Sequence, residues 1–346
     1  TNAQFTFYAQ LSPRSLLIAG LQGGDGNTGG GGLSNYVGLS YEGDNDHDIE
    51  LSDLSFRQLI GDNFALVVGP KGVNAVNVFR GANRVESAGS GPLSRFAQRN
   101  PIVAIGSGDG GVGFDWQVAN RLSLQGVYST TTASDVDNGL FGGDDGVTNF
   151  GAQLVVSPVD DLDIAFQYVN SYSPYGRLFT GVGDDLVALP TGQSARAPIS
   201  TNAFGTSLEW RITPGVAAGG WFGFTTSDLK AFGDGTVETT NWMAYLNFPD
   251  LGGEGNLGGL YFGQPTRITR SDLSDGLNVP SFVNEGDLTA PSGDQPGTTY
   301  HLEAFYRYRL NDNIAITPGV ITVFNPNQND DNDTVVIGAI RTTFSF

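Results

Sequence analysis

Alternation of apolar and polar residues, repeated along almost the whole chain, is the feature that most constrains the fold. Residues 203–212 read AFGTSLEWRI, in which Phe204, Leu208 and Trp210 fall on one face and mostly polar residues on the other. Residues 299–310 alternate in the same way over a longer span. Because successive side chains of a β-strand point to opposite faces, this period of two predicts strands with one apolar and one polar face.

Sixteen such segments can be counted, and several exceed the roughly 5–6 residues of an ordinary soluble strand. Their length matches the ~9–11 residues of a tilted strand that crosses a bilayer. The predicted strands span 3–12, 15–22, 35–42, 48–60, 63–71, 110–119, 121–131, 147–157, 161–171, 202–213, 215–227, 237–249, 256–268, 298–311, 313–324 and 334–346.

The connections between these segments are of two kinds. Short turns at one rim and long loops at the other are typical of an outer-membrane barrel. The first two connections do not follow this rule, because 12–14 is short and 23–35 is long, and a strand count that differs by two therefore stays open. The other short turns are predicted at 61–63, 119–121, 159–161, 213–215, 252–256 and 311–313, and the other long loops at 72–109, 132–146, 172–201, 228–236, 269–297 and 325–333.

The ends of the strands carry further signals of a membrane barrel. A sheet that spans a bilayer must close, because an open edge would leave unpaired backbone groups in hydrocarbon. The last segment suits such a sheet, since Ile340, Phe344 and Phe346 share one face. We therefore predict an all-β fold, a transmembrane antiparallel β-barrel of about 16 strands that forms a single domain over residues 1–346 and encloses water. Aromatic residues expected in its two interfacial girdles are Tyr128, Tyr168, Trp221, Phe224, Phe248 and Phe324.

Composition excludes several classes of function. The chain has no cysteine and only two histidines, His47 and His301, and its 17 Lys and Arg against 36 Asp and Glu give a net charge of −19. Disulfides and thiolate metal sites are therefore excluded, and a nucleic-acid partner is not expected. We predict no catalytic residue, no metal and no cofactor. The acidic stretches lack the glutamate-closed spacing of an EF-hand, and we interpret them as a solvated surface; they lie at 42–48, 141–146, 182–186 and 327–333.

Three stretches resemble a known family. They are LSYEGDNDHDIELSDLSFRQLIGDNFALVVG (39–69), GPLSRFAQRNPI (91–102) and the C-terminal ITPGVITVFNP…VVIGAIRTTFSF (316–346). In these stretches the chain resembles the cyanobacterial outer-membrane porins of the OprB type, a carbohydrate-selective porin family whose members are sometimes called iron-uptake porins. The resemblance implies a 16-stranded barrel in the outer membrane, passive diffusion of small ions and hydrophilic solutes, and a homotrimer.

Members of this family usually carry further segments before the barrel. These are a signal peptide, an SLH domain that grips a peptidoglycan-linked polymer, and a coiled-coil spacer. Residues 1–10 enter a strand pattern at once and lack the basic start and apolar core of a signal peptide. We therefore expect this chain to be the barrel region, with the polymer bound only through an N-terminal SLH domain that it does not include.

The loop 72–109 is the candidate selectivity element. In 16-stranded porins the loop after the fifth strand folds into the lumen, and the resemblance places 72–109 there. The stretch 71–101 holds five cations against one carboxylate, Glu86, a net charge of +4 that is costly against lipid but tolerable in a water-filled lumen. Basic rings favour anions. The predicted constriction residues are Lys71, Arg80, Arg84, Arg95 and Arg99.

Charged residues on the polar strand faces are predicted to line the lumen wall. Opposed positive and negative clusters would create a transverse field there; alternatively, the loop arginines pair with wall carboxylates and hold the loop in place. The predicted wall residues are Arg211, Arg307, Arg309, Glu209, Glu303 and Asp163.

The predicted function is an outer-membrane porin for inorganic ions and small hydrophilic solutes, with selectivity set by the Arg-rich loop. A carbohydrate-selective channel, a barrel enzyme that uses His301, and a soluble β-rich binding module stay open as alternatives.

Overall fold

The structure, a computed structural model, describes residues 2–26, 33–41, 43–143, 145–190, 196–230, 234–274, 276–279 and 295–345. Its strands are β1 (Asn2–Ser12), β2 (Ser15–Gly26), β3 (Gly43–Asp44), β4 (Glu50–Ile60), β5 (Phe64–Lys71), β6 (Gly110–Ala119), β7 (Leu122–Thr130), β8 (Thr148–Val159), β9 (Leu162–Ser173), β10 (Ile199–Thr213), β11 (Val216–Leu229), β12 (Thr236–Pro249), β13 (Leu257–Ser271), β14 (Tyr300–Asn311), β15 (Ile314–Phe324) and β16 (Val335–Phe344). The short helices are α1 (Ser34–Val37), α2 (Ala75–Val78), η1 (Phe96–Gln98), η2 (Pro101–Ala104), η3 (Gly139–Phe141) and η6 (Pro326–Gln328).

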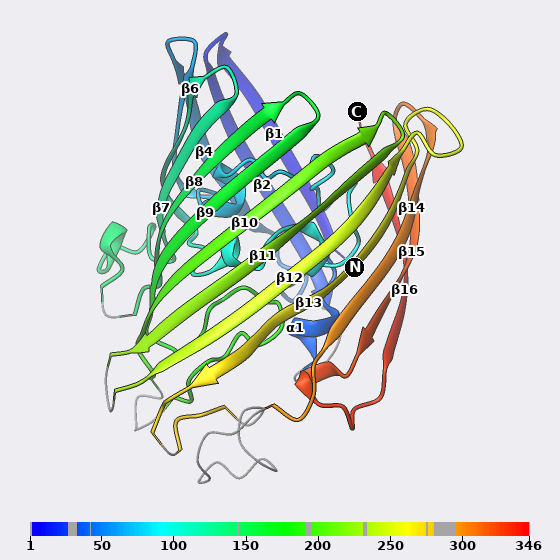
Figure 1. Ribbon diagram of the computed structural model, residues 1–346. Helices are drawn as coiled ribbons and strands as arrows, with labels where there is room; N and C mark the ends of the chain where they lie inside the picture. The colour runs from blue at the N-terminus through cyan, green and yellow to red at the C-terminus, as the bar shows by residue number, and fades with distance from the viewer. Residues whose placement is uncertain are drawn as a thin grey trace.

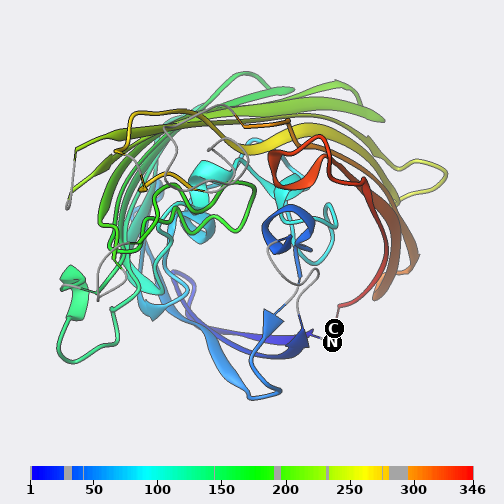
Figure 2. The same cartoon turned by 90° about the horizontal axis from the view of Figure 1, so that it is seen from below.

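All long strands belong to one antiparallel sheet that curls into a barrel (Figures 1 and 2). Neighbours in the sheet are also neighbours in the chain, from β1 through β2 and β4 to β16, while the two-residue β3 pairs only with β2. The predicted all-β barrel is therefore confirmed. None of the helices formed by the described residues is long and apolar enough to cross a membrane.

The third predicted strand, 35–42, is wrong. Its place is taken by α1 and an irregular segment, in which Tyr36 and Val37 are buried against the loop residues Leu93 and Phe96. The consecutive residues Tyr36 and Val37 are both buried, which a helical turn packed inside the barrel allows and a strand with one polar face does not.

Removing that strand also removes the exception to the loop-length rule. Fifteen strands now follow one another in the sheet, so every short turn lies at one rim, the upper one in Figure 1. Because the strands alternate in direction, β1 and β16 run the same way. No pairing joins these two edge strands within the described ranges.

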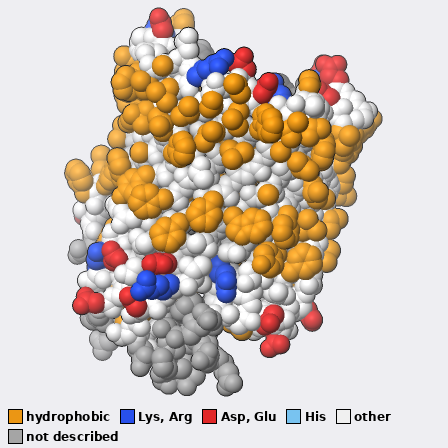
Figure 3. Space-filling view, viewed as in Figure 1, with side chains coloured by type: hydrophobic (Ala, Val, Ile, Leu, Met, Phe, Trp, Pro, Cys, Tyr) orange, Lys and Arg blue, Asp and Glu red, His pale blue; other side chains and the backbone are white. Residues whose placement is uncertain are grey.

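The two faces of the sheet differ as the alternation predicts. Register places Phe204 opposite Phe224 and Leu208 opposite Gly220 on the outer face. Large apolar side chains such as Phe166, Phe204 and Phe222 are exposed there. In Figure 3 apolar side chains cover the middle of the visible face, with charged ones toward its two ends. This is the distribution that a hydrocarbon layer between two aqueous phases requires.

Trp221 does not belong to the outer girdle in which it was predicted. It faces inward on β11, opposite Ser207 and Met243, and is 5% exposed. Its ring packs edge-on against Phe96, with the centroids 6.1 Å apart. Alternation alone could not separate a girdle aromatic from an inward aromatic, because the choice depends on what fills the barrel. Phe346, the last predicted face residue, lies outside the described residues.

Residues 72–109, called the inward loop below, fill part of the barrel. Ile102 and Val103 of η2 belong to an apolar cluster with Val169 and Ala203, which face inward from β9 and β10. The wall makes room for η2 with glycine. A Cβ added at Gly205 would lie 2.4 Å from Ile102 Cδ1. The inward-facing residues of the strands thus leave room for this loop and pack against it, as its predicted inward fold requires.

Candidate functional site

A buried carboxylate on β14 holds the middle of the inward loop. Glu303 is fully buried and accepts hydrogen bonds from the backbone N–H groups of Leu93 and Ser94 and from the Ser94 hydroxyl. His301 Nε2 lies 3.1 Å from Ser94 Oγ. Two loop N–H groups that would otherwise be buried without an acceptor are therefore satisfied by one wall side chain.

Ser94, His301 and Glu303 share the residue types of a hydrolytic triad but not its geometry. In a triad the serine and the carboxylate bond to opposite ring nitrogens of the histidine. Here both Ser94 Oγ and Glu303 Oε2 approach Nε2, at 3.1 and 3.5 Å. All three side chains are buried, and the Phe96 ring lies edge-on to the imidazole. The cluster fits an anchor for the loop and offers no path for a substrate.

The last strand holds the tip of the inward loop. Arg341 Nη1 donates to Ala88 O at 2.7 Å and Pro92 O at 3.2 Å, and Nη2 donates to Gly91 O at 2.6 Å. Arg307 Nη1 donates to Ser90 O at 3.1 Å. Arg341 was not among the predicted site residues, although it stands on the polar face of its strand, because nothing in the sequence shows which carbonyls it would meet.

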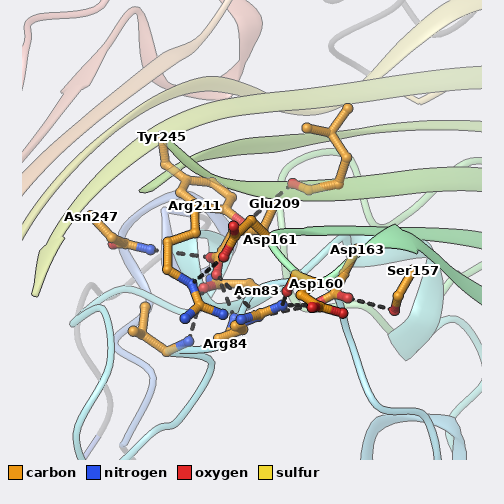
Figure 4. A network of polar contacts seen from close by, with 12 residues as sticks. Asn83, Arg84, Ser157, Asp160, Asp161, Asp163, Glu209, Arg211, Tyr245 and Asn247 are labelled. Carbon is orange, nitrogen blue, oxygen red and sulfur yellow. Dashed lines mark hydrogen bonds and ion pairs between the residues drawn. The ribbon is translucent and has the colours of Figure 1, made fainter. Parts of the chain in front are cut away.

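A third attachment joins the loop to β9 and β10 (Figure 4). Arg84 Nη2 lies 2.6 Å from Asp163 Oδ2 and 3.2 Å from Asp160 O, and Arg84 N lies 3.3 Å from Glu209 Oε2. Glu209 Oε2 also accepts from Tyr245 OH at 3.2 Å. Here the predicted loop arginine and two predicted wall carboxylates meet, in the arrangement that the structural alternative describes.

The other predicted cations have different surroundings. Lys71 pairs with Asp109 at 2.8 Å, and Arg99 forms an ion pair with Glu86. Arg95 and Arg99 line a cavity of about 220 Å³ beside Thr180. Arg80 is exposed.

The predicted wall residues Arg211, Arg307 and Arg309 all lie toward the short-turn rim. Arg211 faces Asp161 at 3.4 Å, Arg309 pairs with Asp312, and Arg307 Nη2 donates to Gly255 O at 3.3 Å. Each of these arginines therefore contacts a residue of a short turn. Their role in selectivity stays a prediction.

The long loops are tied together by a buried aspartate that the sequence interpretation had placed on the surface. Asp184 accepts from Tyr36 OH at 2.7 Å, Ile268 N at 2.9 Å and Gln295 Nε2 at 2.6 Å. It is 7% exposed, and its neighbour Asp185 is 6% exposed, so the solvated interpretation of 182–186 is wrong.

Burial raises the pKa of Asp184, and it raises the pKa of Tyr36 well above its ordinary value. The two groups share one hydrogen bond, in which the neutral phenol donates to the carboxylate. Within the described ranges no group of three His, Asp or Glu side chains is placed to hold a metal ion.

An apolar exterior, a polar interior and a loop anchored across the lumen define a porin-type membrane barrel. The sequence profile of the "Carbohydrate-selective porin, OprB family" matches residues 27–346, and the chain belongs to that family.

Two curated relatives are similar to the chain in sequence, and one solved structure is similar to it in fold. An uncharacterized protein of Synechocystis sp., sll0772, is 34% identical over 336 residues, which cover 90% of this chain and 57% of that protein. An uncharacterized protein of Nostoc sp., alr4550, is 33% identical over 273 residues, covering 75% of this chain and 43% of that protein. The chain thus spans about half the length of the curated relatives it matches. Pseudomonas putida OprB has a similar fold, with a TM-score of 0.56 at 12% identity, covering 96% of this chain and 83% of that chain.

Proposed function

We propose that this chain forms a water-filled channel in an outer membrane, through which inorganic ions and small hydrophilic solutes diffuse passively. The observation that carries the proposal is the loop of residues 72–109, which is held inside the barrel by Glu303, Arg341 and Asp163. A barrel whose apolar side chains face outward, and whose interior is narrowed by an anchored polar loop, suits a channel better than a binding module in solution or an enzyme.

Single-channel recording in planar bilayers tests this proposal. Purified protein should produce large, steady conductance steps that scale with salt concentration. Absence of such steps from folded, detergent-extracted protein would refute the channel.

Selectivity is proposed to depend on the inward loop. Arg95 and Arg99 line the cavity of about 220 Å³, and Arg95 is exposed in it. Replacing both by glutamate should move the reversal potential under a salt gradient toward cation preference, because charged rings select by sign. An unchanged potential would place these arginines outside the ion path.

A carbohydrate channel is the second candidate. It is supported by the family description, carbohydrate-selective porin. Liposome swelling with sugars of increasing size, set beside conductance for chloride, phosphate and iron salts, separates the two candidates. Swelling with monosaccharides at rates comparable to ions favours the carbohydrate channel.

We further infer a single barrel domain that assembles as a homotrimer, as the family resemblance implies. The apolar outer face of the barrel supplies the surface for contact with lipid and with neighbouring barrels (Figure 3). Mass measurement of the detergent complex tests the trimer. Attachment to a peptidoglycan-linked polymer is proposed only for a longer protein that carries an SLH domain.

A further inference from the structure

Two arginines, Arg57 and Arg80, bring their guanidinium groups together beside β4. Arg57 stands on the inward face of β4, between the buried Ser55 and the exposed Leu59. Arg80 belongs to the inward loop. The two guanidinium groups lie close enough to repel each other, and both line a recess of about 80 Å³. Neither guanidinium makes a hydrogen bond or an ion pair with any residue that the structure describes.

The position of Arg80 is fixed by side chains of the wall. Its N–H donates to Gln125 Oε1 at 2.8 Å, and its C=O accepts from Gln153 Nε2 at 2.8 Å. Gln153 Nε2 also donates to Gln125 Oε1, and Gln167 Nε2 donates to Gln153 Oε1. These glutamines are buried. A connected amide network thus holds the backbone of a residue whose charged end is left exposed in the channel.

Arg57 is half-buried, and its Nε is buried without a hydrogen-bond partner. A buried charged donor without an acceptor is costly, and a second cation beside it adds repulsion. Asp53 attracts Arg57 electrostatically, but neither nearby carboxylate among the described residues offers it a direct ion pair. Asp53 Oδ1 accepts from Ser55 Oγ at 2.7 Å, and Asp115 Oδ1, on the recess wall, accepts from Ser123 Oγ at 2.7 Å. In the described part of the chain, neither carboxylate comes within ion-pair distance of Arg57 or Arg80, so the attraction between Asp53 and Arg57 acts without a direct contact.

We propose that Arg57 and Arg80 form a binding subsite for a small oxyanion of the phosphate or carboxylate class. Planar guanidinium forks match the oxygen pairs of these anions, and one anion between the two would both accept from the arginines and screen their repulsion. The recess exceeds the ~10–15 Å³ that one water molecule needs, so an ion can enter it. The inference rests on the proposed channel only for how an anion reaches the subsite.

The subsite lies apart from the paired arginines of the same loop. Arg84 and Arg99 are engaged with Asp163 and with Glu86. The cations of 71–101 therefore differ in whether a carboxylate neutralises them, although they belong to the same loop. Arg80 differs because its guanidinium makes no ion pair in the described part of the chain. It also lies beside a second arginine, Arg57 of β4, which is 23 positions earlier in the chain.

Binding of inorganic phosphate to the folded, detergent-solubilised barrel tests the subsite directly. The readout is the ³¹P line width of phosphate at constant ionic strength, in the wild type, R57Q, R80Q and the double variant. The matched control is R14Q, which removes the same charge from a surface pair with Asp62 at the short-turn rim. The wild type and R14Q should broaden the phosphate line, and the double variant should bind at least about tenfold more weakly.

Competition and conductance complete the experiment. Succinate should displace phosphate, as another oxyanion, and neutral glucose should not. Phosphate should also reduce the chloride conductance of the wild type and leave that of the double variant unchanged. Equal phosphate binding by the wild type and the folded double variant, or no binding by either, would overturn the subsite. Protein that binds phosphate but gives no conductance would refute the channel and keep the subsite. Protein that conducts but does not bind phosphate would refute the subsite and keep the channel.

Discussion

Glu303 is the wall side chain whose removal should release the inward loop most directly. It is fully buried and is the acceptor for the N–H groups of Leu93 and Ser94, which are themselves buried. In Glu303→Ala both N–H groups lose their acceptor inside the protein. Each buried donor left unsatisfied costs about 1–3 kcal/mol, so the docked state of the loop should lose about 2–6 kcal/mol relative to the released state.

This loss has a measurable consequence for loop opening. Since about 1.4 kcal/mol corresponds to a factor of ten, the opening equilibrium of the segment around Leu93–Gln98 should rise by a factor of at least about 30. Amide hydrogen exchange of that segment reports the opening, and single-channel records should become larger and noisier as the loop leaves the lumen. Glu303→Gln, which keeps one acceptor oxygen, should give about half the loss.

A matched control is Glu238→Ala on β12. Glu238 faces Arg270 at 3.7 Å near the long-loop rim and makes no contact with the inward loop in the described residues. It should leave exchange around Leu93–Gln98 unchanged. If Glu303→Ala exchanged as slowly there as the wild type and conducted identically, the reasoning that assigns loop docking to this carboxylate would be wrong.

Three further predictions concern the anchors and the loops. Gly205→Ala should lower the unfolding free energy by about 1–3 kcal/mol, because the new Cβ would lie 2.4 Å from Ile102 Cδ1. The control Gly338→Ala should leave the unfolding free energy unchanged, because its Cβ would meet nothing within 4 Å. Equal thermal midpoints for the two variants would contradict this prediction. Arg341→Lys keeps the charge but loses the fork that reaches Ala88, Gly91 and Pro92, so the loop tip should become a site of limited proteolysis, and resistance equal to the wild type would argue against the anchor. The raised pKa of Asp184 means that the folded state keeps a proton that the unfolded state has released; its contribution to stability should therefore be greatest below about pH 4 and be lost as the pH rises through the folded-state pKa. Asp184→Asn should flatten this part of the stability–pH curve, and parallel curves for the two proteins would refute the assignment.

The strand pattern and the loop lengths could be predicted because both follow from local chemistry. A period of two sets which side chains share a face. Glu209 and Arg211 could therefore be placed on one face of their strand, and Leu208 and Trp210 on the other, from the sequence alone. The same rule misplaced 35–42, where Tyr36 and Val37 form a helical turn and pack on Leu93 and Phe96. A short apolar run is compatible with either a strand or a helical turn until the residues that pack against it are known.

Charge partners could not be predicted, because they come from residues far apart in the chain. Arg84 of the inward loop meets Asp163 of β9, and Asp184 accepts hydrogen bonds from Tyr36, Ile268 and Gln295, which come from three distant parts of the chain. Nothing in the acidic stretch 182–186 distinguishes these buried carboxylates from solvated ones.

By itself, the sequence of this protein determined the barrel and its membrane-facing surface, since alternation, strand length and loop length are properties of neighbouring residues. The entry of the loop 72–109 into the lumen was implied by the family resemblance. Only the tertiary structure decided which cations of that loop are neutralised and which remain open. Arg84 and Arg99 are paired, while Arg80 is held by the wall glutamines and faces Arg57. An ion pair depends on the distance between two side chains that can lie far apart in the chain, and that distance is set only once the sheet has curled around the loop.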